Sequence, residues 1–320
     1  MSNYLEVLEI LDKKIELGES KIIDFNIANL YTSTKIEIPI IIERAKEPGP
    51  TILITAAIHG DEINGVEIVR RLIARKINKP KRGTIICIPI LNVFGFLSAE
   101  RAFPDGRDLN RSFPGTKRGS LASRVAFHFT SQILPHADYC LDFHTGGASR
   151  FNAAQVRINS GDKKLMHLAK VFNAPFTVVS NNLKKTYRST CNKMGIPIIL
   201  FEGGKTLESN KQIVNYGLKG TKRILDHLDM LDPKFKVTKP LTDTVIIKRS
   251  KWIRAQKSGL IHVKVSCNDR VEKGTLLASI TDPYGKMHFK VLAPNKGYII
   301  NVNQAAIVHQ GDAIFHISVK

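Results

Sequence analysis

The sequence has few cysteines, no long hydrophobic run and a deficit of acidic residues. Its four cysteines are widely separated and form no CxxC pair: Cys87, Cys140, Cys191 and Cys267. This spacing excludes a compact cysteine metal site and a dense disulfide framework, so we expect reduced, mostly buried thiols. No apolar run approaches the roughly 18 residues of a membrane span. The N-terminus lacks the order of a signal peptide, and we expect a cytoplasmic protein without a membrane partner.

The acidic deficit gives the chain a formal net charge of +20, from 48 Lys plus Arg against 28 Asp plus Glu. A charge of this size is compatible with binding to nucleic acid or to an anionic membrane. The basic residues, however, are spread along the chain in tracts of at most two and are not interleaved with aromatic stacking platforms. We therefore favour a solvated basic surface that attracts acidic substrates over a dedicated nucleic-acid site.

The 320 residues, of which 43% are hydrophobic, suffice for one large domain with or without a smaller one. Up to about residue 235, β-branched runs alternate with amphipathic stretches, which is typical of an α/β fold with helices on both faces of a sheet. The predicted strands are 35–45, 51–58, 83–91, 138–145, 175–180 and 195–204. A KEPGP turn is expected between the first two strands. The predicted helices are 63–76, 120–134, 163–172 and 210–231.

The pattern changes after residue 230. The stretch LDPKFKVTKP (231–240) contains two prolines and little periodicity, which predicts a linker. Beyond it we expect only short strands and turns, and residues 258–280 are echoed by 295–317 as a weak repeat of small β units. Such a repeat is similar to the barrel-sandwich of biotinyl and lipoyl carrier domains. We therefore predict two domains, residues 1–235 and an all-β domain at 241–320.

His59 and Glu62 follow a predicted strand in the stretch AAIHGDE. Binding sites of open α/β sheets lie at this end of a strand. A His and a Glu three residues apart across a tight turn can face one point, with Gly60 permitting the close turn. The simpler interpretation is that Asp61 and Glu62, in the first turn of the next helix, complement its dipole. The pair alone does not decide between a metal site and a helix start.

A second histidine and another glutamate favour the metal site. His144 ends the strand DYCLDFHT, flanked by Asp142, and Glu202 ends the apolar strand IPIILFE. Two histidines and one glutamate suffice for a catalytic zinc, which keeps its fourth position open for water. A glutamate beside that water is the expected general base. The alternative for Glu202 is an ordinary carboxylate in a loop just past the sheet.

The segment 92–119 between the two histidine strands is rich in Gly, Pro and Arg. Long loops inside a compact domain are usually functional or disordered. This one carries Arg101, Arg107 and Arg111 in ERAFPDGRDLNRSFPG. Guanidinium groups bind carboxylates in a bidentate fashion and can stabilise an oxyanion. A single arginine is usually solvated, but three in one loop indicate an anion-binding function.

The motifs HGDE, DLNRSFPG, DFHTGG and FEGG, in this order, resemble those of the succinylglutamate desuccinylase and aspartoacylase family, a branch of the zinc carboxypeptidase superfamily. The resemblance implies a zinc-carboxypeptidase-like mixed sheet with helices on both faces and one zinc ion per chain. It implies His59, Glu62 and His144 as the zinc ligands and Glu202 as the base that activates water. It further implies that the carboxylate of Asp108 orients the first histidine.

The same resemblance assigns the polar residues of the loop. Arg101 is similar to the arginine that stabilises the oxyanion, and Asn110 with Arg111 to the pair that binds the substrate carboxylate. The stretch FPDG lengthens the gap before this pair, so the choice between Arg101 and Arg107 stays open, with Arg101 favoured. Arg150 follows the second histidine and is expected either to contact an acidic group of the substrate or to have a structural role.

We therefore predict a zinc-dependent hydrolase that cleaves the amide bond of an N-acyl amino acid or a related small carboxylate-bearing amide. The nearer alternative is a carboxypeptidase that removes acidic residues from peptide tails, with the same site and a longer cleft. The farther alternative is a non-enzymatic binding or carrier protein that uses the β domain and the positive surface. A homo-oligomer remains open, because fold-level likeness does not determine assembly.

Overall fold

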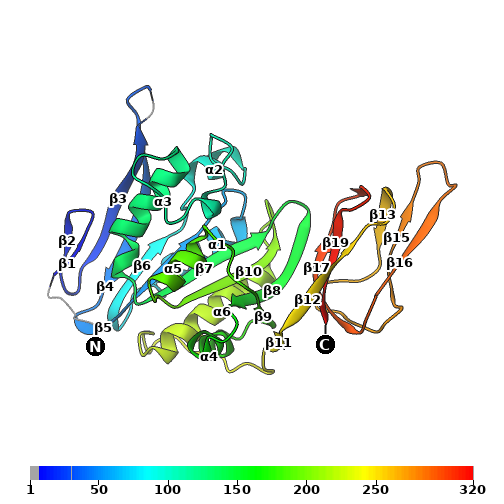
Figure 1. Cartoon of the computed structure of the whole chain (residues 1–320). Helices are drawn as coiled ribbons and strands as arrows, with labels where there is room; N and C mark the ends of the chain where they lie inside the picture. Colours follow the sequence, from blue (N-terminus) through cyan, green and yellow to red (C-terminus); the bar gives the residue numbers. More distant parts are fainter. Residues whose placement is uncertain (1–6, 30, 320) are drawn as a thin grey trace.

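The first two thirds of the chain alternate strands and helices around a central sheet (Figure 1). The structure is a computed structural model that describes residues 7–29 and 31–319. The strands in this part are β1 (Leu8–Ile10), β2 (Lys13–Ile15), β3 (Ser20–Asn29), β4 (Lys35–Arg44), β5 (Glu47–Ala56), β6 (Arg82–Ile88), β7 (Tyr139–Gly146), β8 (Arg150–Ile158), β9 (Phe176–Val179) and β10 (Ile198–Lys205). The α-helices are α1 (Ile63–Ala74), α2 (Val93–Ser98), α3 (Leu121–Gln132), α4 (Lys163–Phe172), α5 (Tyr187–Lys193) and α6 (Lys211–His227).

Within the described residues, only strands follow α6. They are β11 (Val245–Ile247), β12 (Arg249–Arg254), β13 (Gly259–Val263), β14 (Arg270–Val271), β15 (Leu276–Thr281), β16 (His288–Leu292), β17 (Gly297–Asn303), β18 (Ile307–Val308) and β19 (Ala313–Val319). The predicted linker, 231–240, forms neither helix nor strand. No helix in the described part of the chain has the length and apolar character to span a membrane.

One sheet of 13 strands runs through both parts of the chain. Its main path is β12-β19-β17-β8-β10-β7-β5-β6-β4-β3. The central strands β10, β7, β5 and β6 are parallel, whereas β8 and β17 pair antiparallel. The β8–β17 pairing carries the sheet from the first part of the chain into the C-terminal strands. A separate four-stranded sheet, β16-β15-β13-β18, lies beyond it. The predicted mixed α/β architecture is confirmed.

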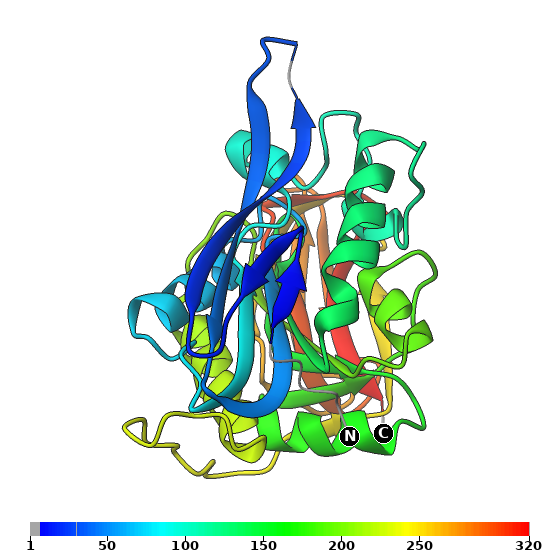
Figure 2. The same ribbon diagram turned by 90° about the vertical axis from the view of Figure 1, so that its left-hand side faces the viewer.

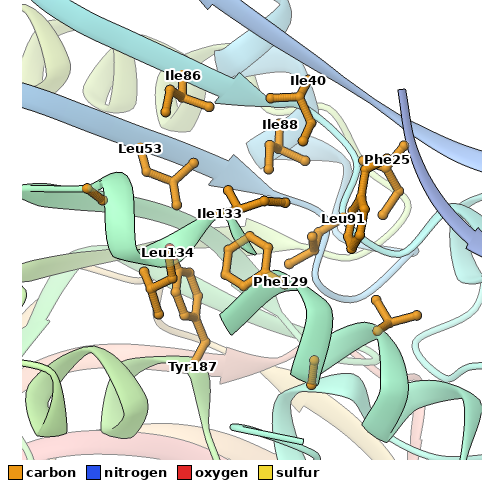
Figure 3. Packing of buried hydrophobic residues seen from close by; sticks show 14 of the residues in the cluster. Phe25, Ile40, Leu53, Ile86, Ile88, Leu91, Phe129, Ile133, Leu134 and Tyr187 are labelled. Carbon is orange, nitrogen blue, oxygen red and sulfur yellow. The ribbon is translucent and has the colours of Figure 1, made fainter. Parts of the chain in front are cut away.

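Helices cover both faces of the central sheet. Successive strand residues point to opposite faces, so an apolar strand presents apolar side chains to the helices on each side. In β5, Leu53 packs in the cluster formed with α3 and α5, whereas Ile52 and Ile54 pack in the cluster formed with α1, α4 and α6. Figure 3 shows the first cluster, in which Phe129 and Tyr187 lie near Leu53. The view in Figure 2 shows the long β3–β4 hairpin extending beyond this layered body.

Local sequence explains where three helices begin. The side chains of Ser120, Asp162 and Asn210 accept hydrogen bonds from backbone N–H groups in the first turns of α3, α4 and α6. Such N-caps satisfy donors that have no partner within the helix. The helices predicted to start at 120 and 210 therefore begin at their cap residues. The four cysteines are free thiols, three of them buried, as expected.

Several predictions of secondary structure were wrong. The KEPGP turn is absent, because β5 already begins at Glu47, and a register shift between Glu47 and Thr51 accommodates the prolines. The segment 92–119 contains α2 and a 3-10 helix, Leu109–Arg111. Strands β3 and β8 and helix α5 were not predicted. Polar residues interrupt the apolar pattern of β8, since one of its faces lines a pocket rather than the core.

Candidate metal centre and active site

His59, Glu62 and His144 meet at the carboxyl end of the parallel strands. His59 follows β5 by three residues, Glu62 directly precedes α1, and His144 lies near the end of β7. Because β5 and β7 are parallel neighbours, their ends lie together. All three side chains are buried, and one ligand atom of each lies within 4.8 Å of the others. The arrangement is suited to hold a metal ion.

Glu62 joins the two histidines. Its Oε1 lies 2.7 Å from Nδ1 of His59, and its Oε2 lies 3.0 Å from Nδ1 of His144. The sequence predicted Glu62 in the first helical turn, but it is the N-cap residue of α1, and its side chain makes no capping hydrogen bond. Its Oε2 instead accepts a hydrogen bond from the backbone N–H of Thr145. The carboxylate is therefore directed at the metal site and not at the helix.

Two further carboxylates hold the opposite nitrogen of each ring. Asp108 Oδ1 lies 3.1 Å from Nε2 of His59, the contact that the resemblance implied. Asp142 Oδ2 lies 2.7 Å from Nε2 of His144. A carboxylate on Nε2 fixes the tautomer that leaves Nδ1 free to bind a metal. The sequence analysis assigned no role to Asp142, although its position two residues before His144 places both on one face of β7.

The electrostatics of this cluster suit a cation. Burial alone would raise the pKa of the Glu62 carboxyl, but His59 and His144 outweigh burial and hold this pKa far below its usual range. Burial alone would lower the pKa of His144, but Asp142 and Glu62 raise it well above its usual value. Metal binding requires neutral imidazoles. The charged groups of the cluster are then three carboxylates and one nearby guanidinium, that of Arg101, so the cluster has a net charge of −2. The donor set therefore fits a divalent metal ion.

The outer carboxylates give a testable expectation. Replacing Asp142 with Asn should weaken metal binding about 10- to 100-fold, because the amide holds the His144 ring less firmly in the binding tautomer. Asp108→Asn should act in the same direction through His59. Competition with a chromogenic chelator measures the affinity. An unchanged metal affinity in both variants would contradict the orienting role.

Gly60 allows the turn that carries His59. A side-chain Cβ at this position would lie 1.8 Å from the backbone carbon of Gly95 in α2. The turn between His59 and Glu62 therefore packs directly on the α2 backbone, which only glycine permits. The sequence analysis expected Gly60 to permit a tight turn; the structure gives another reason for the glycine, its packing against α2, a helix that was not predicted.

Glu202 faces the metal site from the neighbouring strand. In β10 it pairs with His144 of the parallel strand β7, and it lines the same pocket as the three metal-site residues. Its side chain is 18% exposed, and Nε of Arg157 lies 2.5 Å from its Oε2 in an ion pair that lacks hydrogen-bond alignment. Glu202 lies within the strand, so the alternative of a loop carboxylate past the sheet is wrong.

Arg101 and Arg107, the two alternatives for the oxyanion arginine, line different cavities. Arg101 lines the pocket, with its guanidinium 2.8 Å from Asp108 Oδ2 and 3.5 Å from Glu62 Oε1. Arg107 forms an ion pair with Asp105 at 3.2 Å and lines an adjoining cavity instead. Of these two arginines, Arg101 is the one positioned beside the metal-site residues.

The other predicted binding residues also line the pocket. The Oδ1 atom of Asn110 accepts a hydrogen bond from the backbone N–H of Tyr187, which leaves its amide donors available. Arg111 donates to the backbone carbonyl of Asn110, and Arg150 to that of Gly147. Within the described residues, neither of these two guanidiniums forms an ion pair with a carboxylate. They are available to an anionic ligand.

The pocket has a volume of about 630 Å³ and draws residues from both parts of the chain. Its lining also includes residues outside the predicted site residues, among them Arg157, Arg188, Trp252 and Asn301. Burial, and then the charge of Arg157, lowers the pKa of Arg188 to about 10. Trp252 and Asn301 lie on β12 and β17, far from the metal-site motifs in sequence. Nothing in the local sequence marked these two residues, because only sheet pairing brings them to the pocket.

His316, next to this pocket, should make the fold sensitive to acid. Burial, and then the charge of Arg157, lowers the pKa of His316 to about 4. The unfolded chain takes up this proton below about pH 6.5, whereas the folded protein does not until about pH 4. The free energy of unfolding should therefore fall by up to about 3 kcal/mol as the pH drops through this interval.

His316→Phe should reduce this acid sensitivity, because phenylalanine keeps an aromatic ring but cannot bind a proton. Urea unfolding of both proteins at several pH values between 7 and 4 measures the difference. Parallel stability curves for the two proteins would show that His316 does not contribute to it.

The chain is similar to several known proteins. Residues 48–228 match the family model described as the succinylglutamate desuccinylase/aspartoacylase catalytic domain. The N-alpha-acetyl-L-2,4-diaminobutyric acid deacetylase of Halomonas elongata is 27% identical over 290 residues, which cover 87% of this chain and 84% of that protein. The product-bound structure of the ectoine utilization protein EutE (DoeB) from Ruegeria pomeroyi is similar, with a TM-score of 0.83, 24% identity and full coverage of both chains.

A succinylglutamate desuccinylase/aspartoacylase structure from Rhodobacter sphaeroides has a TM-score of 0.80 and 24% identity, with 94% of this chain and 96% of that chain covered. At this identity the two structures establish a shared fold. The family-model match spans more than half of the 320 residues. The chain therefore belongs to the succinylglutamate desuccinylase/aspartoacylase family of amide hydrolases.

Proposed function

We propose that this protein is a zinc-dependent deacylase that hydrolyses the amide bond of an N-acyl amino acid or a related small carboxylate-bearing amide. The observation that carries the proposal is the convergence of His59, Glu62 and His144 with a second glutamate, Glu202, in one arginine-lined pocket. The similarity to a deacetylase of an N-acetylated amino acid supports the same class of substrate.

His59, Glu62 and His144 would hold the zinc ion through the two Nδ1 atoms and the carboxylate. Two histidines and one glutamate are a common ligand set of catalytic zinc, and they leave one position open. Bound zinc supplies Lewis-acid polarisation of the amide carbonyl and lowers the pKa of water. The carboxylates of Asp108 and Asp142 keep both imidazoles in the orientation that this requires.

Glu202 acts as the general base and then as the general acid. Its carboxylate takes a proton from the attacking water as the water oxygen bonds to the amide carbon. It returns this proton to the nitrogen as the carbon–nitrogen bond breaks, which releases a carboxylic acid and an amine. Arg157 lies against Oε2 of Glu202 and leaves Oε1 to exchange the proton.

Three residues of the long loop and one of β8 bind the charged groups of the substrate. Arg101 donates to the carbonyl oxygen as negative charge develops on it. Arg111 and the amide N–H group of Asn110 bind the substrate carboxylate, since a guanidinium can donate two parallel hydrogen bonds to one carboxylate and the amide can donate another. Arg150 binds a further acidic group of the substrate.

We also infer that residues 241–320 form a small barrel-sandwich domain of their own, next to a hydrolase domain at 1–235. The C-terminal strands support this division because they share a separate apolar cluster. Its buried members include Val271, Leu277, Ile280, Val291 and Phe315. A separate core is what an independent domain requires.

A hydrolysis screen tests the proposed function. Zinc-loaded protein is incubated with N-acetyl and N-succinyl amino acids and with short acidic peptides, and the release of free amine is measured. We expect release from the N-acyl amino acids. Faster release of C-terminal glutamate from the peptides would favour a carboxypeptidase instead. No release from any of them would contradict an amide hydrolase with this substrate range.

A further inference from the structure

The single tryptophan of the chain, Trp252, lines the same pocket as the metal-site residues. It lies on β12, outside the residues 48–228 that match the family model. One face of its indole stacks on the imidazole of His316, with ring centroids 4.5 Å apart and planes 7° from parallel. The residue is 38% exposed, so part of the indole remains available to a ligand.

A row of cross-strand neighbours holds Trp252 in place. Trp252 pairs with His316 on β19, His316 pairs with Asn301 on β17, and Asn301 pairs with Asn152 on β8. The two asparagine side chains are buried and hydrogen-bonded to each other. Paired residues in neighbouring strands present their side chains on one face of the sheet. Trp252 therefore lies on the same face of the sheet as Asn301 and Asn152, which also line the pocket.

The strand order places Trp252 on a strand that is not a neighbour of the one that carries Glu202. Strands β8, β17 and β19 lie between β10, which carries Glu202, and β12. Neighbouring strands are about 4.8 Å apart, so β12 is several strand widths from Glu202. A small acetyl group bound at the scissile amide would lie near Glu202 and would not extend to the indole.

The indole of Trp252 adds an apolar surface to a pocket lined by several arginines. Of the other large apolar side chains in the lining, Leu200 lies on β10 beside Glu202 and not next to Trp252. An aromatic face that is open to a pocket packs well against hydrocarbon. The pocket therefore offers the open face of an indole in addition to the charged groups around the metal site.

We propose that Trp252 determines substrate specificity by packing against the hydrocarbon of the acyl group that lies farthest from the scissile amide. The enzyme then favours N-acyl amino acids whose acyl chain is longer than acetyl. This inference rests on the proposed function, and it adds the acyl chain length and the residue that selects it.

The fluorescence of Trp252 tests the contact directly, because no other tryptophan contributes to the emission. The zinc-loaded Glu202→Gln variant, which should bind but not hydrolyse, is titrated with N-hexanoyl-L-glutamate and with N-acetyl-L-glutamate. We expect a blue shift of the emission with the hexanoyl compound and little change with the acetyl compound. An unchanged spectrum with the hexanoyl compound, or equal changes with both, would overturn the inference.

Kinetics provide the second test. Trp252→Ala should raise KM for N-hexanoyl-L-glutamate about fivefold to tenfold, with kcat within about twofold and little change in KM for N-acetyl-L-glutamate. Trp252→Phe keeps an aromatic ring against His316 and should restore most of the affinity. It shows whether a loss in the alanine variant comes from the missing aromatic contact or from a folding defect. Lys251→Ala, an exposed neighbour on the same strand, serves as the matched control.

The outcomes separate the two proposals. Equal effects of Trp252→Ala on both substrates, or a loss confined to kcat, would overturn the role of Trp252 even if the enzyme is a deacylase. If the wild-type protein hydrolyses neither compound, the proposed function fails for these substrates. The fluorescence titration still decides whether the acyl chain contacts Trp252.

Discussion

Glu202→Gln should retain the metal and lose about 100- to 10,000-fold in kcat. Glutamine has nearly the same shape as glutamate but cannot take a proton from water or return it to the leaving amine. Since Glu202 is not one of the three metal-site residues, the metal content should stay at the wild-type level. Turnover of an N-acyl amino acid, together with metal analysis of the same sample, measures both quantities.

Glu208→Gln is the matched control for this variant. Glu208 forms an ion pair with Lys205 at 3.2 Å at the end of the same strand and is more exposed than Glu202. The control should keep wild-type turnover. Wild-type activity in Glu202→Gln would contradict the assignment of the base, and loss of metal from it would show that Glu202 acts through the metal site.

His144→Ala should reduce the metal content to near zero and abolish hydrolysis. The substitution removes one of three donor atoms and leaves the carboxylates of Glu62 and Asp142 without the imidazole between them. The wild-type protein should also gain stability when zinc is added, by about 4 kcal/mol at a free zinc concentration of 1,000 times Kd. This gain should be absent in the variant.

Thermal unfolding with and without zinc, combined with metal analysis, tests this expectation. His128→Ala is a suitable control, because His128 lies on α3 next to Phe127 and is not one of the metal-site residues. It should keep both the metal and the zinc-dependent stabilisation. Full metal content in His144→Ala would rule out the site formed by His59, Glu62 and His144.

His59, His144 and Glu202 could be predicted from the sequence because each lies near or just past the carboxyl end of an apolar strand. The carboxyl ends of parallel strands meet at one edge, so His59, His144 and Glu202 had to come close if their strands were parallel neighbours. The structure has this arrangement, with β5 next to β7 and β7 next to β10. The choice between Arg101 and Arg107 could not be made from the loop sequence, because it depends on which guanidinium reaches Asp108.

Apart from the contact of Asp142 with His144, the contacts missed by the sequence analysis join segments far apart in the chain. Arg157 meets Glu202 because β8 returns antiparallel beside β10, with Leu200 opposite Arg157 and Glu202 opposite Gln155. Strand β8 itself was not predicted, since its pocket-lining polar residues break the apolar alternation by which strands are found. Polar residues that line a pocket can thus prevent the prediction of the strand to which they belong.

The sequence by itself determined the α/β character, the order of the main strands and helices, and the residues that gather around the metal site. These features depend on local hydrophobic periodicity and on motifs that follow single strands. Only the tertiary structure decided that β17 pairs with β8 and that Trp252 and Asn301 line the pocket. The physical reason is that strand pairing and register are set by packing between distant segments, and local periodicity contains no information about the partner strand.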